Sequence, residues 1–314
     1  MTVSRKLGDA QTPDEHDIEA CLRAVPQWQG KEISYVMLVG GLMNKNWRIS
    51  VEGDSRRYFV KIPGKGSEAF IDRAAANAAA LNAFSLGIGP EVISFNPQTG
   101  VEICVFLENY RACTNGDFES AQHQHAVIDR YRRFHAGAPL PLTKTIFDMI
   151  DEHVAQAIPL GGHFPADFAW LQHHYANAKA AFLASGLDIV PCFNDPIPGN
   201  FLISDNRPMM LIDYEFASNN ERTYELGVFF GEMFFEERKI EELTEAYFGS
   251  LQPNILARIH VNRFLADMKW GSWAVLNRKL ADWDFDYQKY GVWKYMRARD
   301  VLYDPRWSQW LRTL

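Results

Sequence analysis

The sequence predicts an α+β protein, with a small N-terminal lobe built on an antiparallel five-stranded sheet and a larger, mainly helical C-terminal lobe. Three observations support this fold class. The 314 residues exceed what one minimal core needs, since a domain takes roughly 150 residues. Strand patterns gather before residue 108, and helical patterns dominate after it. We therefore expect an N-terminal lobe of residues 1–108 and a C-terminal lobe of residues 109–314.

The N-terminal lobe begins with a helix signal. Thr12-Pro13-Asp14-Glu15 combines a capping threonine, a proline suited to the first turn and the glutamate of a capping box. This helix is expected to reach about Val25. Apolar, β-branched or alternating segments then predict five strands, and an alanine-rich segment after the third strand predicts a helix at 67–84. The strands are expected at 33–39, 46–51, 58–62, 92–95 and 101–106.

The pattern after residue 109 is mainly helical. One strand-loop-strand segment, expected at 190–214, interrupts the helices. Helical periodicity predicts seven helices around it, at 120–135, 147–157, 168–185, 224–235, 239–248, 255–279 and 286–303.

Charge and composition exclude several classes of protein. The chain has 32 basic against 39 acidic residues, a net charge of −7, which argues against broad nucleic-acid binding because that needs a basic face. No stretch reaches the roughly 18 to 20 apolar residues of a membrane span. The four cysteines show no metal-ligand spacing and are expected to be reduced. We expect a soluble, cytoplasmic protein without nucleic-acid or membrane partners, and the sequence leaves the oligomeric state open.

Three polar residues form the most informative constellation. Asp195 is followed by Asn200 five residues later and by Asp213 at the end of a short strand. Asp195 is expected to accept the proton of a substrate hydroxyl, and Asn200 and Asp213 offer hard oxygen ligands to Mg²⁺. The alternative is two turn residues in a proline- and glycine-rich loop plus a strand-end aspartate. The D-x4-N spacing of protein-kinase catalytic loops, downstream of a five-strand lobe, favours the catalytic interpretation.

Further motifs lie upstream and within this segment. Gly40-Gly41-Leu42-Met43-Asn44 is a glycine turn between two strands, Lys61 sits inside an apolar strand, and Leu211-Ile212-Asp213-Tyr214-Glu215 contains the second aspartate. With Asp195 and Asn200, these segments resemble the choline/ethanolamine kinase family, within the aminoglycoside phosphotransferase-like, protein-kinase-like fold. The resemblance implies that Gly40, Gly41 and Asn44 form a phosphate loop and that Lys61 grips the α- and β-phosphates of ATP.

An aromatic group near the C-terminus resembles the acceptor pocket of that family. Trp270-Gly271-Ser272-Trp273 precedes Phe285 and Tyr290, at the spacing that choline kinases use. The resemblance implies that Trp270, Trp273, Phe285 and Tyr290 surround a quaternary ammonium, which aromatic faces attract by about 0.5–2 kcal/mol per ring. The alternative is that these rings simply belong to the hydrophobic core.

The chain departs from the family pattern at four places. Met43 replaces the threonine of the phosphate loop, and Ile197 stands where eukaryotic choline kinases often have a polar residue. The other two departures concern the catalytic loop and the helix after Lys61. Phe193 stands where the family has a histidine, and we expect it to support the catalytic loop by packing. The helix after Lys61 has no glutamate at the position expected to pair with that lysine; Glu68 and Asp72 are the nearest acids. Glu225 and Glu232 fall where the family often carries acidic residues.

The resemblance implies an ATP- and Mg²⁺-dependent phosphotransferase that phosphorylates the hydroxyl of a small amino alcohol, with choline favoured. Two alternatives stay open. The same chemistry can act on ethanolamine or on an aminoglycoside-like amine. The chain can also be a non-catalytic binder of quaternary ammonium on a kinase scaffold, which would not consume ATP.

Overall fold

The N-terminal region contains a six-stranded antiparallel sheet with strand order β1-β2-β3-β4-β6-β5. The computed structural model describes residues 4–38, 44–64, 66–281 and 284–314, and the statements below concern these residues. The five predicted strands are confirmed, but the predicted strand count is one too low. The additional strand β1 has only two residues, which pair with Tyr35 and Ser34 of β2, and two residues carry no detectable periodicity. The strands are β1 (Arg5–Lys6), β2 (Ile33–Leu38), β3 (Asn44–Val51), β4 (Arg57–Pro63), β5 (Val92–Phe95) and β6 (Glu102–Val105).

Two helices accompany this sheet. Helix α1 (Pro13–Arg23) begins with the predicted capping box of Thr12 and Glu15. Helix α2 (Arg73–Ser85) begins later than the predicted 67–84, because the Asp72 side chain accepts a hydrogen bond from the Ala75 amide and caps the helix there. The preceding residues form the short 3₁₀ turn η2 (Ser67–Ala69). A second 3₁₀ turn, η1 (Pro26–Trp28), follows α1.

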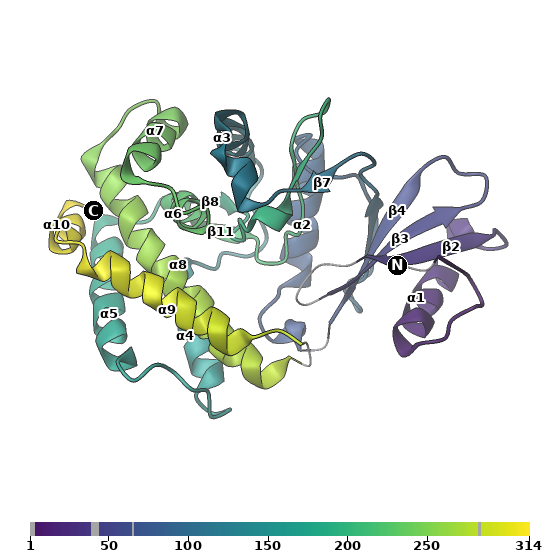
Figure 1. Ribbon diagram of the computed structural model, residues 1–314, viewed down its shortest axis with the longest axis horizontal. Helices are drawn as coiled ribbons and strands as arrows, with labels where there is room; N and C mark the ends of the chain where they lie inside the picture. Colours follow the sequence, from purple (N-terminus) through teal and green to yellow (C-terminus); the bar gives the residue numbers. More distant parts are fainter. Residues whose placement is uncertain (1–3, 39–43, 65, 282–283) are drawn as a thin grey trace.

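The C-terminal region is mainly helical, and its largest helix, α8, packs against α4, α6, α9 and α10. Figure 1 shows α8 and α9 crossing the region beside each other, remote from the sheet strands β2 to β4. The seven predicted helices are confirmed, and the structure adds the short terminal helix α10. The helices are α3 (Ala121–His135), α4 (Ile146–Ala157), α5 (Phe168–Ser185), α6 (Arg222–Glu232), α7 (Glu237–Phe248), α8 (Pro253–Leu280), α9 (Tyr287–Tyr303) and α10 (Trp307–Thr313).

Short strands lie between the sheet and the helices and position the candidate site. They form two antiparallel groups, β10-β9-β7 and β11-β8. The Ile212 amide donates to the Asn200 carbonyl over 3.0 Å, so the loops before β9 and after β10 lie side by side. The elements are β7 (Arg111–Ala112), η3 (Asn115–Glu119), β8 (Ile189–Cys192), η4 (Pro198–Asn200), β9 (Phe201–Ile203), β10 (Met210–Leu211) and β11 (Ser218–Glu221).

The described part of the chain buries three separate apolar clusters. One joins α1 to the inner face of the sheet, one joins α2 and α3 to β9 and α6, and the largest is centred on α8. Among the described helices, none combines the length and hydropathy that crossing a membrane requires.

Candidate active site

Strand β8 leads directly into the loop that carries Asp195. Asn194 adopts a left-handed backbone conformation, φ 69°, which asparagine tolerates better than most residues. Its side-chain amide donates to the Phe216 carbonyl over 2.8 Å and to Ser218 Oγ over 2.9 Å. Asn220 Nδ2 donates to Asn194 Oδ1 over 3.0 Å. Asn194 therefore ties the Asp195 loop to the segment that follows Asp213.

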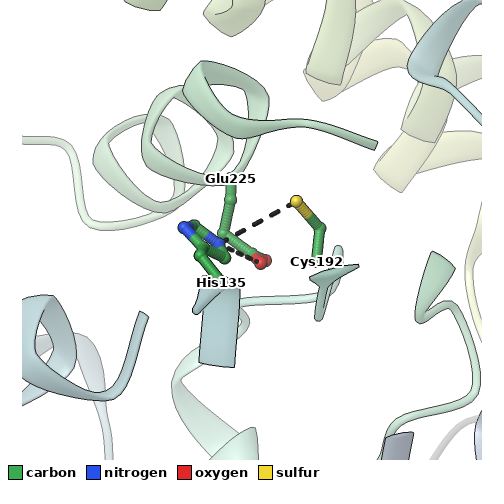
Figure 2. A group of neighbouring side chains, drawn as sticks. All are labelled: His135, Cys192 and Glu225. Atoms are coloured by element: carbon green, nitrogen blue, oxygen red, sulfur yellow. Dashed lines mark hydrogen bonds and ion pairs between the residues drawn. The ribbon is translucent and has the colours of Figure 1, made fainter. Parts of the chain in front are cut away.

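A buried carboxylate on α6 holds the backbone of the same loop through hydrogen bonds. Glu225 accepts hydrogen bonds from the amides of Phe193 and Asn194 over 2.6 and 2.7 Å. His135 Nε2 lies 3.1 Å from Glu225 Oε2 and 3.9 Å from Cys192 Sγ; Figure 2 shows the three side chains converging. Both Glu225 oxygens already accept from the loop, and burial raises the pKa of the Cys192 thiol well above its usual value. A metal would need the thiolate, so this cluster fits loop support better than metal binding.

Asp195 is buried at the end of this loop. Asn200 Nδ2 donates to its carbonyl oxygen over 2.9 Å and to Oδ2 over 3.2 Å. Its other carboxylate oxygen, Oδ1, is buried and has no hydrogen-bond partner among the described residues. Burial raises the pKa of Asp195 to about 7, and the Lys269 ammonium opposes that shift. The unpartnered Oδ1 is the atom suited to accept a proton from a bound hydroxyl.

The donor set of Asn200 and Asp213 fits a magnesium ion. The Asn200 side chain donates through Nδ2 to two oxygens of Asp195, which directs its Oδ1 away from that residue. Asp213 has a left-handed backbone, φ 68°, and its partly exposed carboxylate lies 3.4 Å from Lys61 Nζ. Strained backbone at a non-glycine residue is frequent at functional sites, and hard oxygen donors of this kind are those that Mg²⁺ prefers.

Lys61 on β4 reaches across to the loop after β10. Its Nζ lies 3.3 Å from Glu215 Oε1 and 3.4 Å from Asp213 Oδ1, and Asn44 Nδ2 donates to Glu215 Oε1 over 2.9 Å. Burial opposes ionisation of Lys61, but the carboxylates of Glu215 and Asp213 outweigh it and raise its pKa well above the usual value.

The partner of Lys61 is thus Glu215, a residue to which the sequence analysis gave no role. Asp72 caps α2, and Glu68 is exposed, so the nearby acids serve other purposes. Glu215 belongs to the Ile212-Asp213-Tyr214-Glu215 motif. Its place in this motif is the sequence feature that could have identified it as a functional residue. The candidate phosphate-loop residues Gly40 and Gly41 lie outside the described residues.

The structure brings the four candidate acceptor rings together. On α8, Trp270 and Trp273 are buried with ring centroids 5.6 Å apart. Tyr290 of α9 lies 5.9 Å from Trp273, and Phe285 lies 5.7 Å from Tyr290. The rings also belong to the largest apolar cluster or pack against it. The same contiguous aromatic group is therefore both part of the hydrophobic core and the candidate acceptor site.

Two buried lysines beside these rings were not anticipated. Lys269 Nζ lies 2.9 Å from the centroid of the Trp270 ring and 3.9 Å from that of Phe216. Lys294 lies over Tyr290 at 5.0 Å and is ion-paired with Glu232. The sequence signal for Lys269 is its position directly before the Trp270-Gly271-Ser272-Trp273 motif. From 268 to 276, every other residue of this part of α8 is apolar or small.

Sequence comparison assigns this arrangement to a family. The model of the choline/ethanolamine kinase family matches residues 36–247, more than half of the chain. The LicA protein of Haemophilus influenzae is 20% identical over 270 residues, covering 79% of this chain and 75% of that protein. Ethanolamine kinase 1 of Mus musculus is 23% identical over 310 residues, covering 85% and 83%.

Solved structures support the same assignment. A choline/ethanolamine kinase family protein of Mesorhizobium loti superposes with a TM-score of 0.79 at 26% identity, covering 95% of this chain and 98% of that one. Spectinomycin phosphotransferase APH(9)-Ia has a TM-score of 0.56 at 14% identity, with 95% and 98% covered. That second likeness shows the fold alone, the protein-kinase-like α+β fold of the aminoglycoside phosphotransferases. The chain therefore belongs to the choline/ethanolamine kinase family and is a small-molecule kinase of that family.

Proposed function

We propose that the protein transfers the γ-phosphoryl group of ATP to the hydroxyl of a small amino alcohol, with choline as the favoured acceptor. The observation that carries this proposal is the buried, unpartnered Oδ1 of Asp195, held beside Asn200 and on a loop adjacent to Asp213. A carboxylate in this setting can orient an acceptor hydroxyl and take its proton. The acceptor oxygen attacks the γ-phosphorus, the bond to the bridging oxygen of ADP breaks, and the hydroxyl proton passes to Asp195.

The donor side uses residues from both regions of the chain. Lys61 supplies a buried positive charge for the α- and β-phosphates, and the family resemblance assigns Gly40, Gly41 and Asn44 to the phosphate loop. Asn200 and Asp213 would hold Mg²⁺, which neutralises phosphate charge when bound. Lys61 already lies between Glu215 and Asp213, and this pairing supports a fixed position for its ammonium.

The acceptor side is the aromatic group of Trp270, Trp273, Phe285 and Tyr290. Aromatic faces attract a methylated ammonium, whereas an ammonium with N–H groups needs more oxygen acceptors. Four contiguous rings therefore support choline over ethanolamine. We also propose that the chain divides into an N-terminal lobe of residues 1–108 and a C-terminal lobe of residues 109–314. The acceptor site then lies wholly in the C-terminal lobe.

The test is release of ADP in the presence of Mg²⁺, with choline, ethanolamine and amino sugars as separate acceptors. We expect acceptor-dependent ADP release that is greatest with choline and is lost without Mg²⁺. Greater release with ethanolamine or an amino sugar would replace choline as the acceptor. Choline binding without any ADP release would instead support the non-catalytic binder.

A further inference from the structure

Lys269 is a buried cation without a hydrogen-bond partner. Its side chain projects from α8, the residue is fully buried, and none of the described groups forms a hydrogen bond with its Nζ. Its closest contacts are two aromatic faces, those of Trp270 at 2.9 Å and Phe216 at 3.9 Å from the ring centroids. An intramolecular ammonium thus occupies ring surface in the candidate acceptor site.

The charged groups around Lys269 come from several elements. Asp195 bears on it from the catalytic loop, Lys144 from the residues that precede α4, Glu152 from α4 itself, and Lys294 from α9. Burial lowers the pKa of Lys269 well below its usual value, whereas the nearby Asp195 carboxylate opposes that shift and favours the charged ammonium. Burial lowers the pKa of His153 on α4, and the charge of Lys269 lowers it further. Lys269 therefore lies in electrostatic reach of both the candidate base and the acceptor rings.

Packing alone does not explain a lysine at this position. A methionine fills a buried gap of this shape without placing a charged group away from water. Burial of an ammonium that lacks hydrogen bonds is costly, and ring faces compensate only part of that cost. A residue with this cost is typical of a functional site, where stability is sacrificed for selectivity.

The inference rests on the proposed function, because it concerns the acceptor of that reaction. We propose that Lys269 is a specificity-determining residue: its ammonium holds the ring faces of Trp270 and Phe216 and weakens the binding of trimethylammonium head groups there. The acceptor's ammonium is then confined to the other three rings of the aromatic group, those of Trp273, Phe285 and Tyr290. Two cations cannot share one ring face without repulsion, so Lys269 sets the size and charge that the site accepts.

The test replaces Lys269 with methionine and measures binding of choline and of tetramethylammonium by calorimetry. Tetramethylammonium has no hydroxyl, so its affinity reports on the rings independently of phosphoryl transfer. We expect both ligands to bind the K269M variant about 10-fold more tightly, within the 2- to 30-fold that one ring face provides. Affinity for ATP should remain unchanged. The K269R variant retains the charge and should bind both ligands as weakly as wild type.

A matched control is Lys144→Met. Lys144 also bears electrostatically on Lys269, but its Nζ pairs with Glu152 and the Phe70 carbonyl. We expect no tighter binding in this variant. Equal tightening by K144M and K269M would mean that the net charge of the region, rather than a charge placed directly on the ring face, sets affinity, and would overturn the proposal.

The remaining outcomes separate this inference from the proposed function. Unchanged choline and tetramethylammonium affinity in folded K269M, judged by its melting temperature and ATP binding, would overturn the inference alone. If wild type released no ADP with any amino alcohol, the proposed function would fail, and the inference with it. Should K269M not fold, Lys269→Gln removes the charge with a shorter polar side chain, and the same tightening is expected.

Discussion

At the scale of single residues, the properties of Asp195 come from burial and from one unpartnered oxygen. Oδ2 is fixed by Asn200, while Oδ1 has no hydrogen-bond partner in the part of the chain that the structure describes. An unmet hydrogen-bonding atom in a buried site has a free-energy cost that a bound hydroxyl would recover. The orientation of Asp195 is therefore set before the acceptor binds, which favours a positioned base over a merely structural carboxylate.

Replacing Asp195 with asparagine tests this assignment. The amide keeps the shape but cannot take a proton, so we expect turnover to fall by about 10² to 10⁴. Nucleotide affinity should change little, because the residues assigned to ATP lie elsewhere. Steady-state kinetics and ATP calorimetry on Asp195→Asn measure the two quantities. Turnover close to wild type would remove Asp195 from the mechanism.

Phe193 departs from the family pattern, and its ring is packed inside the protein. The ring is fully buried and lies 5.4 Å from Tyr214 and 6.4 Å from Phe201. Restoring the family residue with Phe193→His would bury a polar ring in this apolar group, at a cost of about 1–3 kcal/mol. We expect a melting temperature lower by several degrees and turnover within a modest factor of wild type. An increase of several orders of magnitude would show that the native chain is an impaired kinase.

At the scale of elements, helix α6 determines where the catalytic loop lies. Glu225 accepts from two consecutive amides of that loop, and hydrogen bonds to a buried charge contribute about 1.5–3 kcal/mol each. Glu225→Gln leaves one oxygen acceptor and turns an NH₂ group towards the other amide. We expect lower turnover with a nearly unchanged KM for ATP, and a reduced melting temperature. Unchanged turnover with the same loss of stability would make Glu225 a fold-supporting residue only.

Helices α8 and α9 together present the acceptor rings. Trp273 and Tyr290 lie on different helices but are only 5.9 Å apart, so each is expected to contribute a face to the same ammonium. Loss of one ring by Trp273→Ala or Tyr290→Ala should weaken choline binding roughly 2- to 30-fold. ATP affinity should barely change, because the family resemblance assigns these rings to the acceptor and assigns Lys61 and Asp213 to ATP and its metal. Unchanged choline affinity in both folded variants would assign the rings to the core alone.

At the scale of the whole molecule, local sequence predicts elements better than it predicts what they contact. The capping box at Thr12 and Glu15 identified α1, and helical periodicity identified α5 at its observed bounds. By contrast, β1 and α10 are too short for a periodic signal, and their formation depends on neighbours already in place. The candidate residues of the Asp195 loop were selected by their spacing in the sequence. Residues a few positions apart in a short loop necessarily lie close together in the fold.

The partners of those motif residues required the tertiary structure. Lys61 and Glu215 are separated by more than one hundred and fifty residues, and no local rule pairs them. Lys269 was missed for a related reason: a lysine on a helix is usually solvated, and only the packing of α8 buries this one. Prediction from sequence therefore selected polar residues that the structure places close together, but it missed the charges that surround them.

The pairing of Lys61 with Glu215 joins the sheet to the helical region. Strand β4 supplies the lysine, the loop after β10 supplies the glutamate, and Asn44 of β3 adds a third link. The same contact fixes the ammonium assigned to the ATP phosphates. A change at Glu215 should therefore alter ATP binding through the relative position of the two regions.

Glu215→Gln keeps the size and the acceptor oxygen but removes the charge that holds Lys61. We expect ATP affinity to fall about 10-fold, equivalent to roughly 1.4 kcal/mol, with choline affinity little changed. The matched control is Glu102→Gln: Glu102 also bears on Lys61, but it lies on β6 beside β4 in the same sheet. Because its loss leaves the link between the regions intact, it should cost less ATP affinity. Equal losses in the two variants would mean that total negative charge near Lys61 matters and that the bridge between the sheet and the helices does not.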